Sequence, residues 1–282
     1  MAARARLARH ELGPRAPHRR RRGRRALGPR CGNALRRRTL ARGRGRADVR
    51  PLAAWTSFVL AFASLSYAVR FTEGKPQKDV LYQWSTVANS LVQFAIIGLI
   101  VYGISGLGNR RQLLALRRPT SWWVALGIGV AIGIGITILT AALGPLLHPG
   151  REQGVTPDVW EPKHAAAYVA NGLVICIIAP IVEELTFRGL GYSVLVRFGR
   201  WTAIILVGIA FGLAHGLVEA FPFLAAFGAG LAYLRSKVDS VYPGMIVHGL
   251  FNATALAVAV SGKPQQENML RACAGVWSLL HF

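Results

Sequence analysis

Residues 119–150, which read PTSWWVALGIGVAIGIGITILTAALGPLLHPG, contain no Asp, Glu, Lys or Arg. About 20 apolar residues in a helix suffice to cross the hydrocarbon core of a bilayer, so this run predicts a transmembrane helix. A second run without these residue types lies between Asp239 and Lys263. In lipid, only helices and closed β-barrels satisfy the hydrogen-bonding groups of the backbone. The alternating sequence pattern of barrel strands is absent, so these runs predict helices.

Apolar segments of this kind recur along the chain, and they predict an all-α, polytopic transmembrane helical bundle with seven to eight spans. We place the spans at 52–69, 85–107, 121–147, 165–196, 201–218, 220–235 and 241–261. The segment 269–282 is too short to span dependably, which leaves the eighth crossing open. The predicted parts are a basic tail (1–50), three N-terminal helices (51–164), a catalytic helical core (165–262) and a C-terminal segment (263–282).

The charge distribution predicts the orientation in the cell membrane. The first 50 residues hold 18 Arg and only two acidic residues, so most of the net charge of +22 lies there. Basic residues also follow alternate spans, whereas the other loops are near neutral or acidic; the basic ones are Arg110, Arg111, Arg117, Arg118, Arg197, Arg200, Arg235 and Lys237. Because Arg and Lys collect in cytoplasmic loops, we expect a cytoplasmic N-terminus.

The tail itself is rich in Arg, Ala, Gly and Pro, a mixture that cannot bury a core and is typical of disorder. It can contact anionic lipid through its Arg side chains, while nothing in it favours a specific nucleic-acid site. An alternative interpretation is that the tail precedes the true start of the protein, although no Met follows Met1 until Met245.

Ionisable residues inside predicted spans are costly and are candidates for function by default. The fourth span contains Glu183, Glu184 and Arg188. The fifth contains His215, and the seventh contains His248 together with Asn252. Polar residues of this kind can also simply hold helices together.

The spacings of these residues indicate their partners. Glu184 and Arg188 are four residues apart on one helix face and should pair, which leaves Glu183 free to face another group. His248 and Asn252 are also four apart, so their side chains point into the same space.

The depths of these residues in the membrane, measured along each helix from its cytoplasmic end, predict that their side chains meet. At 1.5 Å of rise per residue, Glu183 lies roughly 21 Å from Arg197 at the cytoplasmic boundary. His215 and Asn252 lie roughly 22 and 20 Å from their own boundaries. A carboxylate and an imidazole in one dehydrated cavity can activate water, and a second His with an amide can donate to a developing oxyanion. The set therefore favours amide hydrolysis.

Three motifs carry a family resemblance. They are Glu183-Glu184-Leu185-Thr186-Phe187-Arg188-Gly189, Phe211-Gly212-Leu213-Ala214-His215 and His248-Gly249-Leu250-Phe251-Asn252. At these residues the chain resembles the CPBP family of intramembrane proteases, which includes CAAX prenyl proteases and bacteriocin-processing enzymes and is also called the Abi family. The resemblance covers about residues 165–261.

The resemblance implies an intramembrane endopeptidase that cleaves a membrane-associated protein or peptide. It implies that Glu183 activates water with help from His215, that His248 and Asn252 stabilise the oxyanion, and that Glu184 and Arg188 hold the site together. We favour a mechanism without a cofactor. The alternative is Zn²⁺ held by Glu183, His215 and His248, since two histidines and a carboxylate can bind catalytic zinc.

Two other classes of function remain open from the sequence. Intramembrane carboxylates and histidines also relay protons in transporters, although the chain shows no pair of repeated halves with matching broken helices. A non-catalytic family member acting in immunity or scaffolding would carry the same residues.

Overall fold

The computed structural model describes residues 49–73, 79–148 and 160–260, and all regular elements within these ranges are helices. These residues belong to one compact unit. The predicted tail, except for its last two residues, and the predicted C-terminal segment lie outside the described residues. The predicted eighth crossing therefore also lies outside them.

Each of the seven predicted spans corresponds to a helix. They are α2 (Arg50–Glu73), α3 (Trp84–Ser105), α5 (Trp122–Leu147), a composite helix that begins with α7 (Ala165–Leu173), α10 (Arg200–Ala214), α11 (Phe221–Val238) and α12 (Tyr242–Val260). Short helices connect them: η1 (Val80–Tyr82), α4 (Arg110–Leu113) and η2 (Pro162–His164). The predicted all-α bundle is thus confirmed.

Four of these helices are long and apolar enough to cross a membrane: Arg50–Thr72, Trp84–Ser105, Trp122–Leu147 and the composite Pro162–Phe198. Helix α10 is apolar but has only 15 residues, about 22 Å of rise, which is less than the hydrocarbon thickness of about 30 Å. The chain is a multi-pass membrane protein whose shorter helices lie among these long ones.

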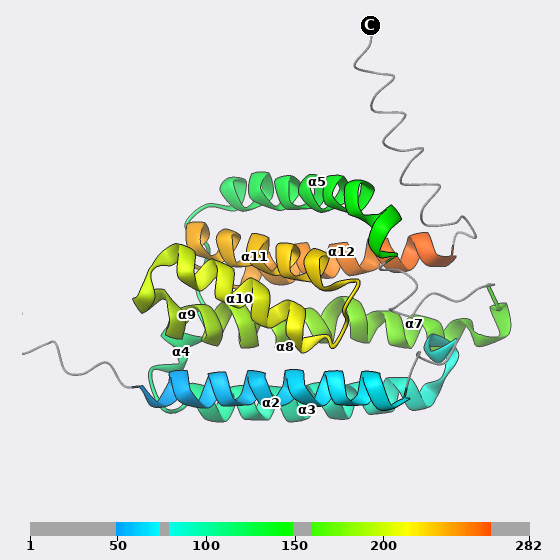
Figure 1. Ribbon diagram of the computed structural model, residues 1–282, viewed down its shortest axis with the longest axis horizontal. Coiled ribbons are helices and arrows are strands. Elements are labelled where there is room, and N and C mark those ends of the chain that lie inside the picture. The colour runs from blue at the N-terminus through cyan, green and yellow to red at the C-terminus, as the bar shows by residue number, and fades with distance from the viewer. Residues whose placement is uncertain (1–48, 74–78, 149–159, 261–282) are drawn as a thin grey trace, which may run out of the picture. The chain divides into compact units, whose positions relative to one another are not determined.

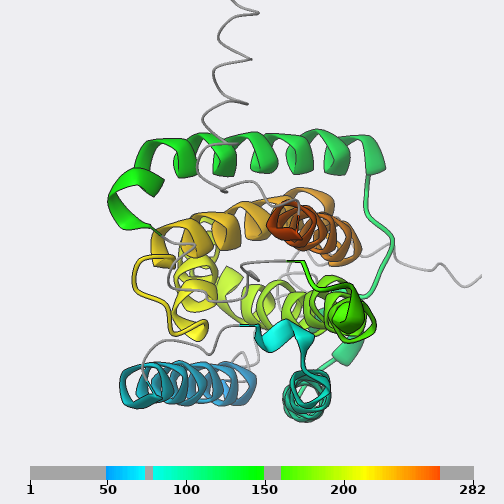
Figure 2. The ribbon, with the colours of Figure 1, turned by 90° about the vertical axis from the view of Figure 1, so that its right-hand side faces the viewer.

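The helices stack in layers that run roughly parallel (Figure 1). In Figure 2, α5 (green) runs across the view on one side of the bundle, α11 and α12 come next, the composite helix and α10 follow, and α2 and α3 lie on the far side. Helix α10 therefore has protein on both sides. Gly208 lets α10 approach α11 closely. A Cβ added at this position would lie 2.7 Å from the Ala225 carbonyl oxygen, too close for any other residue to fit without a shift.

Small residues permit some of the other close contacts. An added Cβ at Gly129 would lie 2.8 Å from a methyl group of Val247, so Gly129 brings α5 against α12. Gly133, on the same helix four residues later, has nothing within 4 Å. The spacing of these two glycines predicts a packing stripe, and this prediction is wrong for Gly133.

The outward surface is apolar, as expected for a bundle in lipid. In α5 only Ala125 and Ile136 are buried, while Trp123 is 83% exposed. Exposed apolar side chains also cover the outer face of α3 (Leu91, Val92, Ile96, Leu99). Because tryptophan favours the membrane interface, Trp122 and Trp123 indicate where α5 enters the bilayer.

Candidate active site

The composite helix contains two π-helical segments on either side of a short α-helical turn. Helix α7 continues into the π segment η3 (Val174–Ile178), then into α8 (Ala179–Glu184) and the π segment η4 (Leu185–Gly191). The last turns are α9 (Tyr192–Leu195) and η5 (Val196–Phe198). π turns within α-helices are frequent at functional sites, and here they enclose the turn that carries the acidic pair.

Pro180 frees a backbone carbonyl of the composite helix, and this carbonyl attaches the acidic turn to α12. The Ala179 N–H bonds to the Val174 carbonyl oxygen, five residues earlier, and Pro180 has no N–H to donate. The Ile175 carbonyl is therefore left without these two donors. It accepts instead from Nδ2 of Asn252 on α12, at 2.9 Å.

A second anchor lies on the other side of the acidic pair. Nε1 of Trp55, a buried residue of α2, donates to the Thr186 carbonyl oxygen at 2.9 Å. Gly191 packs directly against the same indole, since an added Cβ would lie 2.5 Å from it. The turn with Glu183 and Glu184 is thus held between α12 and α2.

Glu184 and Arg188 form the predicted ion pair, and both side chains are fully buried. Nη1 of Arg188 donates to Oε1 of Glu184 at 2.7 Å, and Nη2 donates to the Gly228 carbonyl oxygen of α11 at 3.1 Å. The guanidinium also lies 4.3 Å from the centre of the Phe211 ring. Paired and hydrogen-bonded in this way, the two charges tie the composite helix to α10 and α11.

His248 on α12 lies between the two carboxylates. Its Nδ1 is 3.3 Å from Oε1 of Glu184, and its Nε2 is 3.7 Å from Oε2 of Glu183. A side chain at Gly244 would collide with Oε2 of Glu184, so glycine lets α12 approach. The buried ion pair is thereby connected through an imidazole to Glu183, whose side chain remains 19% exposed.

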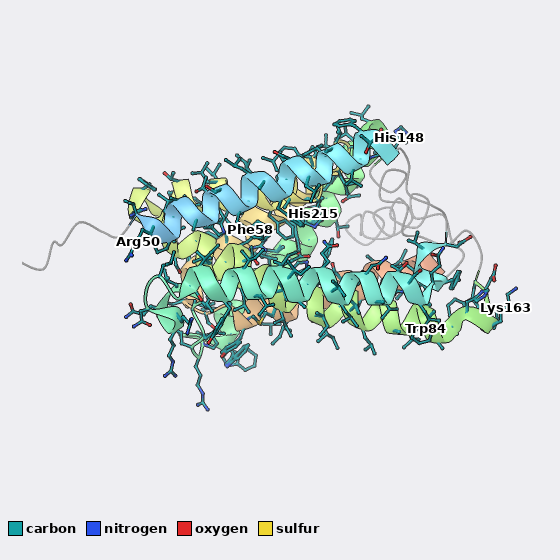
Figure 3. All side chains as sticks on the ribbon, turned by 90° about the horizontal axis from the view of Figure 1, so that it is seen from below. Arg50, Phe58, Trp84, His148, Lys163 and His215 are labelled. Carbon is teal, nitrogen blue, oxygen red and sulfur yellow. The ribbon has the colours of Figure 1, made fainter. Side chains whose placement is uncertain are left out.

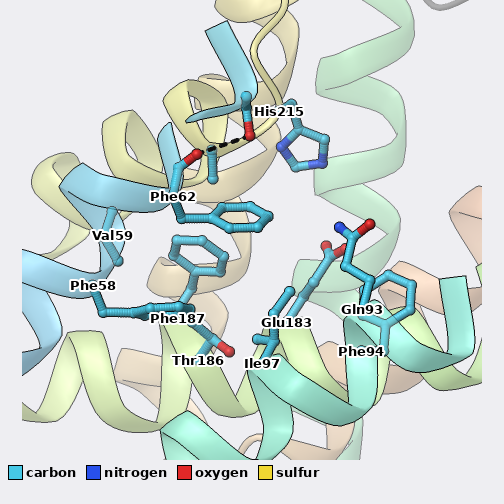
Figure 4. A pocket seen from close by; sticks show the side chains of 12 residues that line it. Phe58, Val59, Phe62, Gln93, Phe94, Ile97, Glu183, Thr186, Phe187 and His215 are labelled. Carbon is cyan, nitrogen blue, oxygen red and sulfur yellow. Dashed lines mark hydrogen bonds between the residues drawn. The ribbon is translucent and has the colours of Figure 1, made fainter. Parts of the chain in front are cut away.

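Glu183 and His215 line one cavity of about 300 Å³ on the side of the bundle where α2 and α3 lie (Figure 4). Figure 3 shows these two helices diverging, with Phe58 and His215 between them. The other lining residues are mostly apolar: Phe58, Val59, Phe62, Ser66, Gln93, Phe94, Ile97, Thr186, Phe187 and Ala214. The carboxylate and the imidazole face a mainly apolar pocket that includes four phenylalanines and one amide.

His215 ends α10 and has one ring nitrogen committed to the backbone. Its Nδ1 lies 2.7 Å from the Phe211 carbonyl oxygen, which can only accept a hydrogen bond. Nδ1 therefore carries a hydrogen, and in the neutral ring Nε2 is an acceptor. The second ring nitrogen can accept a proton.

We expect that His215→Asn will separate the structural role of this residue from its chemical role. The Asn amide can keep a donor near the Phe211 carbonyl but lacks the distal nitrogen. The melting temperature should stay close to that of the wild type, while turnover falls by about 100-fold, as for removal of a general acid–base group. Thermal unfolding in detergent and peptide cleavage measure the two effects, and turnover within a few-fold of the wild type would contradict the assignment.

The structure brings the predicted residues together only in part. Glu183 and His215 share the cavity. His248 does not line it, but its Nε2 lies 3.7 Å from Oε2 of Glu183. Asn252 is half-buried and is not among the residues that line the cavity, and its Nδ2 donates one hydrogen bond to the Ile175 carbonyl oxygen. Gln93, which also lines the cavity, was not among the residues predicted from the sequence, because those were chosen mainly for their ionisable side chains and Gln93 is neutral. Its signal is a polar side chain near the middle of an apolar span.

The alternative zinc site of Glu183, His215 and His248 stays a prediction. Within the described ranges, no three His, Cys, Asp or Glu side chains are placed to hold a metal ion. The bond from Nδ1 of His215 to a carbonyl leaves Nε2 as the nitrogen that can act as a base or as a ligand, and both ring nitrogens of His248 face carboxylates.

These features define a helical membrane protein in which buried carboxylates and imidazoles meet at a cavity inside the bundle. Residues 165–254 match the family model of the type II CAAX prenyl endopeptidases described as Rce1-like. This segment contains all three motifs, and the match confirms the predicted resemblance to the CPBP family of CAAX proteases. No curated protein and no solved structure matches the chain. The family match supports an intramembrane endopeptidase.

Proposed function

We propose that this endopeptidase cleaves a peptide bond of a membrane-associated protein or peptide with a water molecule activated by Glu183. The observation that carries the proposal is the shared cavity of Glu183 and His215. Its lining is largely apolar and includes four phenylalanines, which suits an apolar segment of substrate.

The proposed reaction begins when a carboxylate oxygen of Glu183 takes a proton from water. The hydroxide attacks the carbonyl carbon of the substrate, and the carbonyl oxygen becomes an oxyanion. The C–N bond then breaks, and the leaving nitrogen receives a proton from Glu183 or through Nε2 of His215. We assign stabilisation of the oxyanion to His248 and Asn252, while Glu184 and Arg188 hold the site together through their ion pair.

Comparison of protein N-termini in membranes tests the proposed function for any membrane-associated substrate. Cells that express the wild type should contain new N-termini that are missing in cells with Glu183→Gln. Glu219→Gln, a change of an exposed carboxylate outside the cavity lining, serves as the matched control. Identical sets of N-termini in wild-type and Glu183→Gln cells would refute a protease and leave the transporter or scaffold alternatives.

We propose a mechanism without a metal cofactor. The expected result is that purified protein holds much less than one zinc per chain and that a strong chelator leaves peptide cleavage unchanged. Elemental analysis and a cleavage assay with 1,10-phenanthroline measure this. A stoichiometric metal whose removal stops cleavage would contradict it.

We also propose that the N-terminus faces the cytoplasm. Arg50 lies at one end of the bundle, whereas Trp84, His148 and Lys163 lie at the other (Figure 3). In a variant without its own cysteines, Lys163→Cys should react with an impermeant maleimide in intact cells. Arg111→Cys should react only after the membrane is opened, and the reverse pattern would overturn the orientation.

A further inference from the structure

Two aromatic rings form a stacked pair at the end of the bundle where α10 begins and α11 ends (Figure 1). The rings of Trp201 and Tyr233 lie 5.9 Å apart, centre to centre, and their planes differ by only 17°. Trp201 is 57% exposed, and Tyr233 is half-buried. Because tryptophan and tyrosine favour the level of the lipid headgroups, this pair indicates where α10 meets the edge of the bilayer.

A cation lies over each of these two rings. Cζ of Arg200 is 5.4 Å from the centre of the Trp201 ring, and Nζ of Lys237 is 5.2 Å from the centre of the Tyr233 ring. Both cationic side chains are exposed. The face of an aromatic ring attracts a cation, so the stacked pair holds positive charges from two helices on one surface. We call these four residues the basic aromatic surface.

The two cations of this surface are not neutralised by acidic side chains of the protein. At the same end of the bundle, Arg117 and Arg235 both bind the carboxylate of Asp239, at 2.8 and 2.7 Å. Within the described ranges, Arg200 and Lys237 take part in no ion pair. Their charges are therefore available to an anion from outside the protein.

The face of α10 below these charges indicates the class of that anion. Ile205 and Ile209 follow Trp201 at intervals of four residues, so the three side chains share one helix face. All three are exposed. An apolar face thus continues from the cations into the bilayer. A phospholipid has the matching arrangement, because its phosphate lies at the membrane edge and its acyl chains run inward.

We propose that the basic aromatic surface binds an anionic glycerophospholipid such as phosphatidylglycerol. The phosphate binds Arg200 and Lys237, for which it is a strong acceptor, and an acyl chain packs along the exposed face of α10. The inference does not depend on the cleavage reaction. Because α10 and α11 build the surface together, it exists only in the folded protein, and bound lipid raises the melting temperature.

The test measures the melting temperature of the full chain in a neutral detergent as lipid is added. Phosphatidylglycerol should raise it, whereas phosphatidylcholine and the soluble headgroup analogue glycerol 3-phosphate should not. Arg200→Gln combined with Lys237→Gln should need about 10-fold more phosphatidylglycerol for the same rise, because each cation near a lipid surface strengthens binding. Every variant keeps the basic residues 1–50, so their attraction for anionic lipid is the same throughout.

Two further variants separate this surface from basic charge in general. Arg111→Gln combined with Arg118→Gln removes two exposed arginines of the loop between α3 and α5, outside the surface, and should need the same amount of lipid as the wild type. The exchange of Arg200→Lys with Lys237→Arg keeps both charges and should also behave as the wild type. Melting temperatures without lipid should agree among all variants, since exposed side chains are usually replaced at little cost.

Several results would overturn the inference. Equal losses of lipid response in the two Gln double variants would show attraction to basic charge alone. A rise with phosphatidylcholine as large as that with phosphatidylglycerol would exclude recognition of an anionic headgroup. A rise with glycerol 3-phosphate would indicate a site for soluble phosphate instead. An unchanged wild-type melting temperature in phosphatidylglycerol, or loss of the response in the charge exchange, would also contradict it.

Discussion

Glu183→Gln is expected to lower the turnover of peptide cleavage by at least about 1,000-fold, in the range of a lost general base. The amide has nearly the same shape as the carboxylate but cannot take a proton from water. The loss should appear in kcat, because the aromatic side chains that line the cavity are unchanged and still bind substrate. Steady-state cleavage in liposomes measures kcat and KM separately.

The fold should tolerate this change. Oε2 of Glu183 is buried without a hydrogen-bond partner and lies 3.7 Å from Nε2 of His248, so the substitution breaks no short hydrogen bond at this atom. The melting temperature in detergent should remain close to that of the wild type. Glu219→Gln controls for loss of a carboxylate outside the cavity lining. Retention of more than a tenth of wild-type kcat in Glu183→Gln would rule out Glu183 as the base.

Arg188→Met is expected to destabilise the protein by about 3–5 kcal/mol, the typical cost of breaking a buried ion pair from one side. The substitution leaves Glu184 charged and fully buried, with Oε1 deprived of its 2.7 Å bond. It also removes the donor to the Gly228 carbonyl. Thermal or denaturant unfolding in detergent measures the loss.

Two further variants test whether the buried charge causes this loss. Glu184→Gln combined with Arg188→Met removes both charges and should be more stable than Arg188→Met alone. Arg200→Met changes an exposed arginine at the start of α10 and should alter stability by about 0.5 kcal/mol or less. If Arg188→Met is as stable as Arg200→Met, the ion pair does not hold this site together.

The helices and the ion pair follow from local rules and could be predicted from sequence. Charge is excluded from hydrocarbon, so the uncharged run at 119–150 located α5, which the structure places at Trp122–Leu147. Glu184 and Arg188 are four residues apart on one continuous helix, and such side chains share a face whatever surrounds them. The same spacing rule predicted that Glu183 does not take part in this ion pair, and in the structure Glu183 lines the cavity.

The composition of the cavity depends on contacts between distant segments. The spacing of His248 and Asn252 places both on one face of α12, but it does not indicate that Asn252 meets the carbonyl of Ile175, 77 positions away in sequence. Nor does it indicate that Gln93 faces the same cavity as Glu183.

The sequence alone therefore determined which segments are helices and which ionisable residues they bring into the bilayer. Spacing and hydropathy are properties of single helices, and they are sufficient for this. Only the tertiary structure decided which polar groups face one another, because that depends on how α2, α3 and α12 pack around the composite helix. That Gln93 lines the same cavity as Glu183 became visible only with the neighbouring helices in place.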